Sequence, residues 1–197
     1  MNTANKLTIS RIVMAVIILI ILMIPWNEFG ISIPSFLVMN KVLVDIRYPI
    51  AGFIFVIACV TDYLDGSIAR KEKTLTDFGA TLDAIADKVL VNGVLILLAY
   101  NGFISVVVPV VIVTRDIAVD ALRALSAKNK VIIKASKWGK VKTIFMMVGL
   151  SLMLFYNLPF EVYGIYVADI LIYIATILSV VSGVMYFINC KDKIKLD

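Results

Sequence analysis

Long apolar runs dominate this chain and limit the folds that are open to it. Hydrophobic residues make up 61% of its 197 residues, more than a soluble domain of this length can bury. Only helices or closed barrels can cross a bilayer, because backbone polar groups find no water there. The runs are continuous instead of alternating in short segments, which favours helices. The sequence therefore predicts an all-α integral membrane protein that forms one domain over residues 1–197.

Several of these runs are long enough to cross a membrane as helices. The loop around Pro34, which follows the first run, is apolar but too short for a further span, and it suits the membrane interface. About six transmembrane helices are therefore expected, at Ser10–Trp26, Arg47–Arg70, Asp77–Tyr100, Ile104–Ser126, Ser136–Leu158 and Val162–Asn189.

The basic residues gather at alternate ends of these runs and predict the orientation of the chain. Lys and Arg are enriched in the cytoplasmic loops of membrane proteins. The opposite loops carry little positive charge beyond Lys41 and Arg47. Both termini are thus expected in the cytoplasm, with a short interfacial segment at the N-terminus and the first helix kept as an anchor in a cell inner membrane. The residues that set this orientation are Lys6, Arg11, Arg70, Lys71, Lys73, Lys128, Lys130, Lys134, Lys137, Lys191, Lys193 and Lys195.

The amino-acid types that the chain lacks restrict its chemistry. It has no His, which excludes Ser-His-Asp and Cys-His catalysis and His-ligated zinc. Its two cysteines, Cys59 and Cys190, are interpreted as small buried hydrophobic residues and not as a disulfide framework. Any acid–base chemistry must therefore come from carboxylates, Lys or Tyr.

An acidic stretch, Thr61 to Val89, interrupts the apolar pattern across the second and third predicted helices. A short basic loop joins these helices, so they are expected to be antiparallel neighbours whose acidic faces meet at the cytoplasmic ends. Helical spacing puts two sets of residues each on one face: Asp62, Asp65, Gly66, Ala69 and Arg70, and Gly79, Asp83 and Asp87.

Four converging carboxylates would repel one another unless a positive charge neutralises them. One interpretation is a set of buried salt bridges with Arg70 and Lys88, but the acids outnumber these bases. The other is a hard divalent cation, Mg²⁺ or Mn²⁺, held by oxygen ligands alone, with room for two ions. The small residues beside the acids leave space for bound phosphates, or else serve close helix packing.

This pattern resembles a known signature. Asp62-x-x-Asp65-Gly66-x-x-Ala69-Arg70, followed after eight residues by Gly79-x-x-x-Asp83-x-x-x-Asp87, is similar to the signature of the CDP-alcohol phosphotransferases, with every position filled. The resemblance covers essentially the whole chain. It implies transfer of a substituted phosphate from a CDP-linked donor to an alcohol, with release of CMP at the cytoplasmic membrane surface.

The resemblance also implies roles for individual residues. Metal binding would fall to Asp62, Asp65, Asp83 and Asp87, as the ligands of two ions, with Asp87 also acting as general base. A cytidine nucleotide would be bordered by Asp62 and Asp65 and by Thr8, Gly66, Ala69, Arg70 and Gly79. A homodimer is implied as well, whereas no nucleic-acid partner is expected.

Further segments resemble the branch of the family that uses glycerol 3-phosphate as acceptor, the phosphatidylglycerophosphate synthases. They are "NKLTISR" (Asn5–Arg11, with Ala4 where Pro is usual), Arg115-Asp116 (where Arg-Glu is commoner), Arg123 and "GKVKT" (Gly139–Thr143). Asn5–Arg11 would equally suit an ordinary interfacial helix start. The expected substrates are CDP-diacylglycerol and glycerol 3-phosphate, among membrane lipids.

A phosphorylated acceptor requires several cations beside the metal site. Arg115 and Arg123 share one helix face, and Lys137 and Lys140 begin the next helix, so these four are the candidate ligands of the acceptor phosphate. Orientation and lipid-headgroup contact are the alternative role for such bases. Inositol, inositol phosphate, serine or phosphatidylglycerol remain alternative acceptors. A divalent-cation transporter remains a different class of function, although its acids should line a route through the midplane.

Overall fold

The computed structural model describes residues 3–72, 77–129 and 137–194, without the side chains of residues 3–6, 27, 63–72, 77, 78, 80, 137 and 192–194. Within these ranges the chain forms long helices, two 3₁₀ turns and one β-hairpin. In chain order they are α1 (Thr3–Met23), η1 (Trp26–Phe29), β1 (Ser35–Val38), β2 (Val42–Asp45), α2 (Arg47–Glu72), α3 (Asp77–Tyr100), α4 (Val107–Lys128), α5 (Lys137–Leu154), η2 (Phe160–Tyr163) and α6 (Val167–Ile194).

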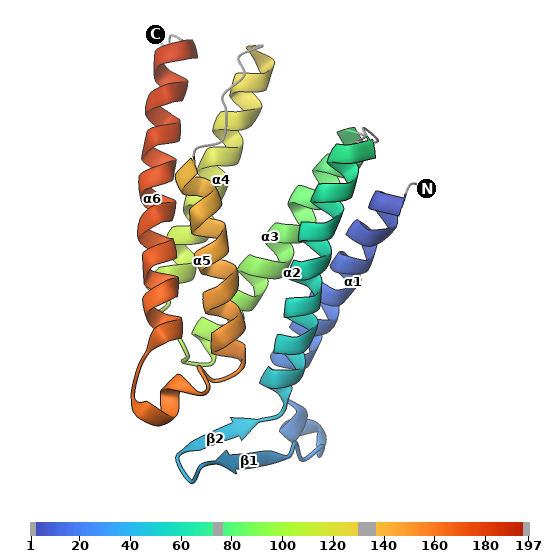
Figure 1. Ribbon diagram of the computed structural model, residues 1–197, viewed down its shortest axis with the longest axis vertical. Coiled ribbons are helices and arrows are strands. Elements are labelled where there is room, and N and C mark those ends of the chain that lie inside the picture. The colour runs from blue at the N-terminus through green and yellow to red at the C-terminus, as the bar shows by residue number, and fades with distance from the viewer. Residues whose placement is uncertain (1–2, 73–76, 130–136, 195–197) are drawn as a thin grey trace.

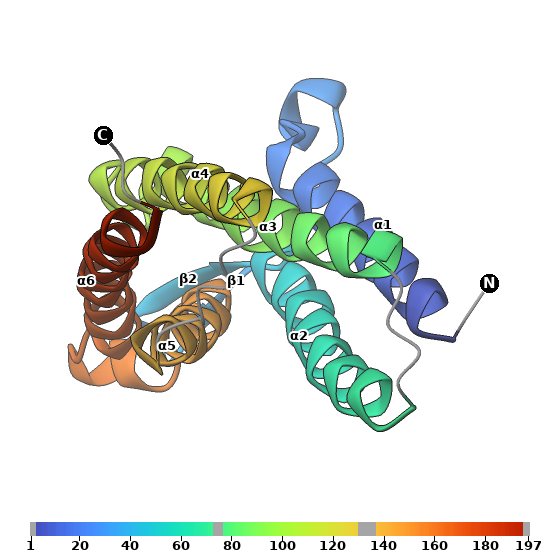
Figure 2. The same ribbon diagram turned by 90° about the horizontal axis from the view of Figure 1, so that it is seen from above.

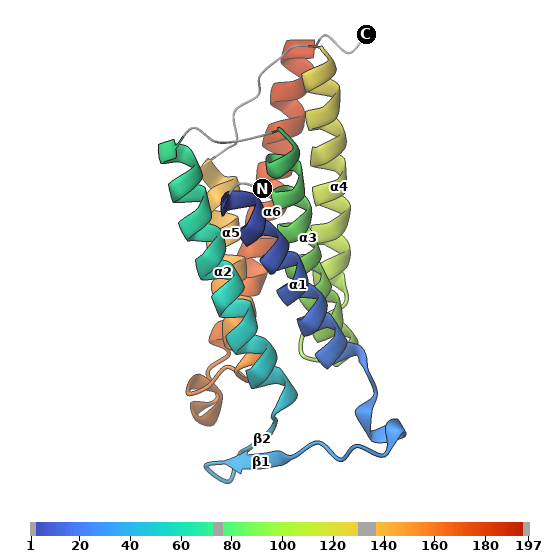
Figure 3. The same cartoon turned by 90° about the vertical axis from the view of Figure 1, so that its right-hand side faces the viewer.

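The helices form two groups of three that diverge toward one end of the molecule (Figure 1). In the first group α1 packs against α2 and α3, and in the second α6 packs against α4 and α5. The groups meet through α2 with α5, and through α3 with α4 and α5. Seen from above, the six helices surround a central region (Figure 2). The start of α1 and the end of α6 lie toward the divergent end, and the β-hairpin lies at the other (Figures 1 and 3).

The helix interfaces combine large apolar side chains with glycines that allow close approach. Phe55, Leu98 and Leu150 are among the fully buried core residues. A Cβ on Gly93 would lie 2.6 Å from a methyl carbon of Leu19, so the glycine leaves room for this side chain where α1 and α3 meet. Small residues at such contacts are typical of helices packed in membranes.

The outward faces of the helices are apolar. Val13 on α1, Phe53 on α2, Ile96 on α3, Ile117 on α4, Ile144 on α5 and Ile177 on α6 are each at least 50% exposed. Among the described residues, one helix, Val167–Lys191, is long and apolar enough to cross a membrane. Leu7–Met23 of α1 is a shorter apolar helix, and α4 carries charged residues within its length, namely Arg115, Asp116, Asp120 and Arg123.

The helical architecture predicted from the sequence is confirmed, and α3 has the predicted bounds. The segment before α2 differs from the prediction, because the apolar loop around Pro34 continues into the antiparallel hairpin β1–β2. Met39 and Asn40 at its tip have positive φ angles of 49° and 55°, which suit a tight hairpin turn. The N-terminal segment expected at the interface is continuous with α1, which begins at Thr3.

The hairpin is tied to both helix groups. Asp45, at the end of β2, accepts hydrogen bonds from the backbone and the side chain of Arg47 and so caps the start of α2. The Asp45 backbone N–H donates to the Tyr156 hydroxyl at 3.0 Å, just beyond α5. Lys41 Nζ donates to the Val162 carbonyl at 3.0 Å, in η2. The end of the molecule opposite the termini is therefore cross-linked by hydrogen bonds.

Candidate functional site

Three carboxylates from two helices converge near the divergent end. Asp62 comes from α2, and Asp83 and Asp87, one helical turn apart, come from α3. One ligand atom from each of the three lies within 4.8 Å of the others, and all three side chains are half-buried. We call these three residues the acidic triad. The predicted convergence of the two acidic faces is thus present for the side chains that the structure describes.

Arg11 of α1 reaches into the centre of the acidic triad. Its Nη1 lies 2.9 Å from Asp62 Oδ1, 2.6 Å from Asp83 Oδ1 and 3.1 Å from Asp87 Oδ1. The Arg11 side chain is 0% exposed. The sequence predicts Arg11 as a marker of orientation and as the end of the segment Asn5–Arg11, but not as a partner of these acids, although an arginine inside an apolar run needs a partner. The free-energy cost of an unpaired arginine in an apolar run is the sequence signal that points to a role for Arg11 in the site.

The surroundings of Arg11 show what kind of group suits the acidic triad. Three carboxylate oxygens surround a single positively charged nitrogen, so the geometry favours a cation at this point. The donors are oxygens without Cys or His, the set that hard divalent cations prefer. The residues present therefore fit a metal ion of this class.

The predicted nucleotide ligands are described only in part. Thr8 is buried on α1, one turn before Arg11, and Gly79 is partly buried on α3, one turn before Asp83. Both thus lie on helix faces next to the acidic triad. The side chains of Asp65, Gly66, Ala69 and Arg70 lie outside the described part of the chain.

A cavity of about 350 Å³ adjoins the acidic triad, enclosed by α3, α4, α5 and α6. Asp87 belongs to the triad and also lines this cavity. The other charged residues of the lining are five bases and two acids: Lys88, Arg115, Arg123, Lys140 and Lys142, with Asp116 and Asp120. The cavity therefore combines a carboxylate at one edge with an excess of positive charge.

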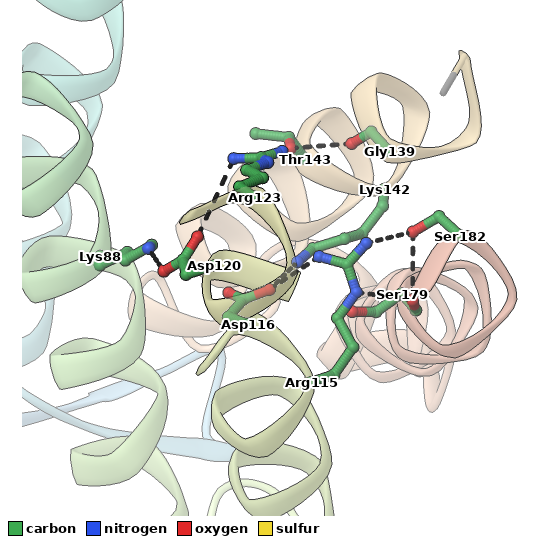
Figure 4. Close-up of polar contacts among 10 residues, drawn as sticks. All are labelled: Lys88, Arg115, Asp116, Asp120, Arg123, Gly139, Lys142, Thr143, Ser179 and Ser182. Atoms are coloured by element: carbon green, nitrogen blue, oxygen red, sulfur yellow. Dashed lines mark hydrogen bonds and ion pairs between the residues drawn. The ribbon is translucent and has the colours of Figure 1, made fainter. Parts of the chain in front are cut away.

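Arg115 is held firmly against α6 (Figure 4). Its Nε donates to the Ser179 carbonyl at 2.9 Å, and its Nη2 donates to Ser182 Oγ at 2.6 Å. A Cβ on Gly183 would lie 3.0 Å from Arg115 Cγ, so this glycine makes room for the arginine. Arg115 Nη1 donates to Asp116 Oδ1 at 3.0 Å. The side chain thus both lines the cavity and joins α4 to α6.

Lys142 of α5 completes the same network. Its Nζ donates to Asp116 Oδ1 at 3.0 Å, and its side chain is 11% exposed. Asp116 therefore accepts from a base of its own helix and from one of α5 (Figure 4). Lys142 is absent from the predicted acceptor ligands, although it stands within the segment Gly139–Thr143 that the sequence singled out.

The remaining cavity bases are more accessible. Lys88 of α3 forms an ion pair with Asp120 of α4, and Arg123 Nη1 lies 3.9 Å from the other oxygen of Asp120. The Arg123 guanidinium stands 5.8 Å from the ring centroid of Tyr186 and its side chain is 57% exposed. Lys140 is exposed at the cavity wall. Arg115, Arg123 and Lys140 thus share one cavity, whereas the Lys137 side chain lies outside the described residues.

A second hollow of about 360 Å³ lies between α2 and α5 and is almost entirely apolar. Cys59, in its wall, is one turn before Asp62 of the acidic triad. Met147 lines both this groove and the basic cavity. An apolar groove therefore runs close to the same site. Its lining residues are Val56, Cys59, Val60, Met147, Val148, Ser151 and Leu152.

Comparisons with known proteins find a matching family model, similar sequences and a similar fold. The family model described as CDP-alcohol phosphatidyltransferase matches residues 1–181. The CDP-diacylglycerol–glycerol-3-phosphate 3-phosphatidyltransferase of Bacillus subtilis is 34% identical over 196 residues, covering 98% of this chain and 97% of the relative. The protein of the same description from Mycoplasma genitalium is 33% identical, covering 98% of this chain and 85% of the relative.

A solved structure shares the fold. It is the crystal structure of Mycobacterium tuberculosis phosphatidylinositol phosphate synthase in its apo form, with a TM-score of 0.62 and 15% sequence identity. The match covers 98% of this chain and 90% of that structure. At this identity the likeness concerns the arrangement of the helices alone.

Proposed function

The chain belongs to the CDP-alcohol phosphatidyltransferase family, and from this membership we propose that it transfers the phosphatidyl group of CDP-diacylglycerol to glycerol 3-phosphate. The products are phosphatidylglycerophosphate and CMP. In this reaction a hydroxyl oxygen of the acceptor bonds to the phosphatidyl phosphorus, the bond from that phosphorus to CMP breaks, and the hydroxyl proton leaves. Relatives with 31–39% identity carry this activity in their descriptions.

The observation that carries the proposal is the double position of Asp87. Its carboxylate is part of the acidic triad, and its side chain lines the basic cavity. A hydroxyl group bound in the cavity would therefore meet a phosphate bound at the triad beside this one carboxylate. Asp87 is accordingly proposed as the general base that accepts the hydroxyl proton.

The acidic triad, together with Asp65, is proposed to hold Mg²⁺ or Mn²⁺, as two ions. The three oxygen donors and the positive group at their centre support a cation here. When bound, such ions neutralise the negative charge of the donor diphosphate and of the departing CMP. Thr8, Gly66, Ala69, Arg70 and Gly79 are proposed to border the nucleotide, which the positions of Thr8 and Gly79 beside the triad support.

The basic cavity is proposed to bind glycerol 3-phosphate. Its volume of about 350 Å³ suits a small molecule, and its bases outnumber its acids. Arg123 and Lys140, which are exposed at its wall, are the proposed direct ligands of the phosphate, with Lys137 beside them. Arg115, which α6 already holds by two hydrogen bonds, is proposed to contribute its charge from a fixed position.

We further propose that all six helices cross a cell inner membrane, with the site facing the cytoplasm. The apolar outward faces of the helices support this proposal, and so does a lipid substrate. The groove between α2 and α5 is suited to an acyl chain, because its wall is apolar and Cys59 lies one turn from the triad. A homodimer is proposed from family resemblance alone.

A single assay tests the proposed reaction. Purified protein in lipid-detergent micelles is given CDP-diacylglycerol, Mn²⁺ or Mg²⁺, and one acceptor at a time: glycerol 3-phosphate, inositol, inositol phosphate, serine, phosphatidylglycerol or free glycerol. We expect CMP release with glycerol 3-phosphate and little with the others. Preference for another acceptor would reject the proposed substrate, and no CMP with any acceptor would reject transfer itself and leave a transporter to be tested.

A further inference from the structure

Arg11 lies at the acidic triad, and the proposed reaction gives it no role. One nitrogen of its guanidinium lies within 3.1 Å of an oxygen from each of Asp62, Asp83 and Asp87. The side chain comes from α1, whereas the acids come from α2 and α3. A single buried cation therefore joins three helices and neutralises part of their carboxylate charge.

This arrangement has the geometry of a metal site with a nitrogen at its centre. Hard divalent cations bind carboxylate oxygens at about 2.0–2.6 Å. A metal ion held at the centre of the acidic triad would therefore need the space that Arg11 Nη1 fills. Two positive groups so close would also repel one another. Arg11 Nη1 and a metal ion at this point exclude each other.

We propose that Arg11 is a positioning residue that competes with the metal. In the metal-free protein its guanidinium holds the triad together, and metal binding displaces it from the carboxylates. This inference rests on the proposed metal site of the transferase. It follows that Arg11 stabilises the site when no metal is bound. It also weakens the apparent metal affinity, because the ion must displace a bound cation.

The test measures metal binding and stability, neither of which depends on turnover. Full-length wild-type protein and Arg11→Gln, in the same detergent, are titrated with Mn²⁺ while free Mn²⁺ is followed by electron paramagnetic resonance. We expect Mn²⁺ to bind at least tenfold more tightly to Arg11→Gln. Thermal unfolding is then compared in EDTA and in saturating Mn²⁺. We expect the variant to lose at least about 5 °C more in EDTA than in Mn²⁺.

Two control variants separate this effect from a general loss of packing. Arg47→Gln removes an arginine from an ion pair with Asp45 at the other end of the molecule, with an N–O distance of 2.6 Å. It should leave Mn²⁺ affinity unchanged and lower the unfolding temperature equally in both buffers. Arg11→Lys keeps the positive charge and should recover most of the stability in EDTA.

Each result decides the matter. Equal or weaker Mn²⁺ binding by Arg11→Gln would overturn the proposal, as would equal instability of Arg11→Lys and Arg11→Gln in EDTA. Arg11→Gln could fold only with Mn²⁺ present. In that case, unfolding of the variant when Mn²⁺ is chelated, under conditions in which the wild type stays folded, supports the proposal. A wild type that binds no Mn²⁺ would instead reject the metal site itself, and CMP release would then show separately whether the transferase function stands.

Discussion

Lys142 of α5 donates a 3.0 Å hydrogen bond to the same oxygen of Asp116 that accepts from Arg115 of α4. Asp116 and Lys142 are 18% and 11% exposed, so little water screens this pair. Removal of one partner from this buried ion pair would leave an uncompensated charge in the wall of the basic cavity. Asp116 therefore orients Lys142 and accepts one of the hydrogen bonds that hold Arg115, beside those that Arg115 donates to α6.

Asp116→Asn tests that dependence. The change removes the counter-charge of Arg115 and Lys142, so we expect the free energy of unfolding to fall by about 1–3 kcal/mol. The apparent KM for glycerol 3-phosphate should rise because Lys142 loses its charged partner and Arg115 keeps only its hydrogen bonds to α6. Asp116→Glu keeps the charge and serves as the matched control. Wild-type stability and KM in Asp116→Asn would show that the network is dispensable.

Loss of a triad carboxylate should abolish transfer without unfolding the protein. We expect Asp62→Asn, Asp83→Asn and Asp87→Asn each to reduce CMP release to background, while thermal unfolding stays cooperative. Asp77→Asn, at the first residue of α3 and outside the signature, should have a smaller effect. Substantial turnover by Asp62→Asn or Asp83→Asn would contradict the proposed metal ligands.

The accessible cavity bases should act on one substrate selectively. Arg123→Ala or Lys140→Ala removes a charge-assisted contact of about 1.5–3 kcal/mol, so the apparent KM for glycerol 3-phosphate should rise at least tenfold. The apparent KM for CDP-diacylglycerol should change much less. Lys128→Ala, an exposed base in the last turn of α4 that does not line the cavity, is the control. Equal losses for both substrates would mean that these bases do not belong to the acceptor site.

A side chain at Gly79 should obstruct the nucleotide. Gly79 lies one turn before Asp83, and the added volume of Gly79→Leu would enter the region proposed for the cytidine nucleotide. We expect the affinity for CMP and CDP, measured by calorimetry, to fall while membrane insertion is kept. Gly102→Ala, at a position with open space around it but a φ of 79°, controls for general effects of glycine replacement. Unchanged CMP affinity in Gly79→Leu would remove Gly79 from the nucleotide site.

Orientation can be tested by labelling with a membrane-impermeant thiol reagent in intact cells. In a background without Cys59 and Cys190, a cysteine at Met39, which is 70% exposed on the hairpin, should react from outside. A cysteine at Lys128, exposed at the end of α4, should react only after the cells are opened. Ser126 is unsuitable because it is buried against Cys190. The reverse labelling pattern would invert the proposed topology.

The helices could be predicted from the sequence because lipid leaves the backbone few choices. Apolar runs with polar ends determined α3 at its observed bounds, Asp77–Tyr100, and the start of α2 at Arg47. The hairpin could not be predicted in the same way. Its strands have four residues each, and it is held by tertiary contacts of Lys41 and Asp45 with the segment after α5. The local amino-acid pattern does not indicate such tertiary contacts.

The candidate site, too, could be predicted from the sequence only in part. Helical periodicity was enough to bring Asp62, Asp83 and Asp87 together, because antiparallel neighbours with one short loop have few alternatives. The position of Arg11 depends on where α1 packs, and that of Lys142 on how α4, α5 and α6 meet. Whether Arg115 contacts a substrate or its own protein depends on Ser179, Ser182 and Gly183, which lie more than sixty residues later.

The hydrogen bonds of the hairpin link the two helix groups at the end of the molecule that lacks the site. Helices such as α2 and α3 are about 35–40 Å long at 1.5 Å per residue. A rotation of about 5° between the two helix groups at Asp45 and Tyr156 would therefore separate their far ends by about 3 Å. The acidic triad belongs to one group, while Arg123 and Lys140 belong to the other. A small change of angle between the groups at the hairpin would thus become a larger change in the distance between the acidic triad and these two bases.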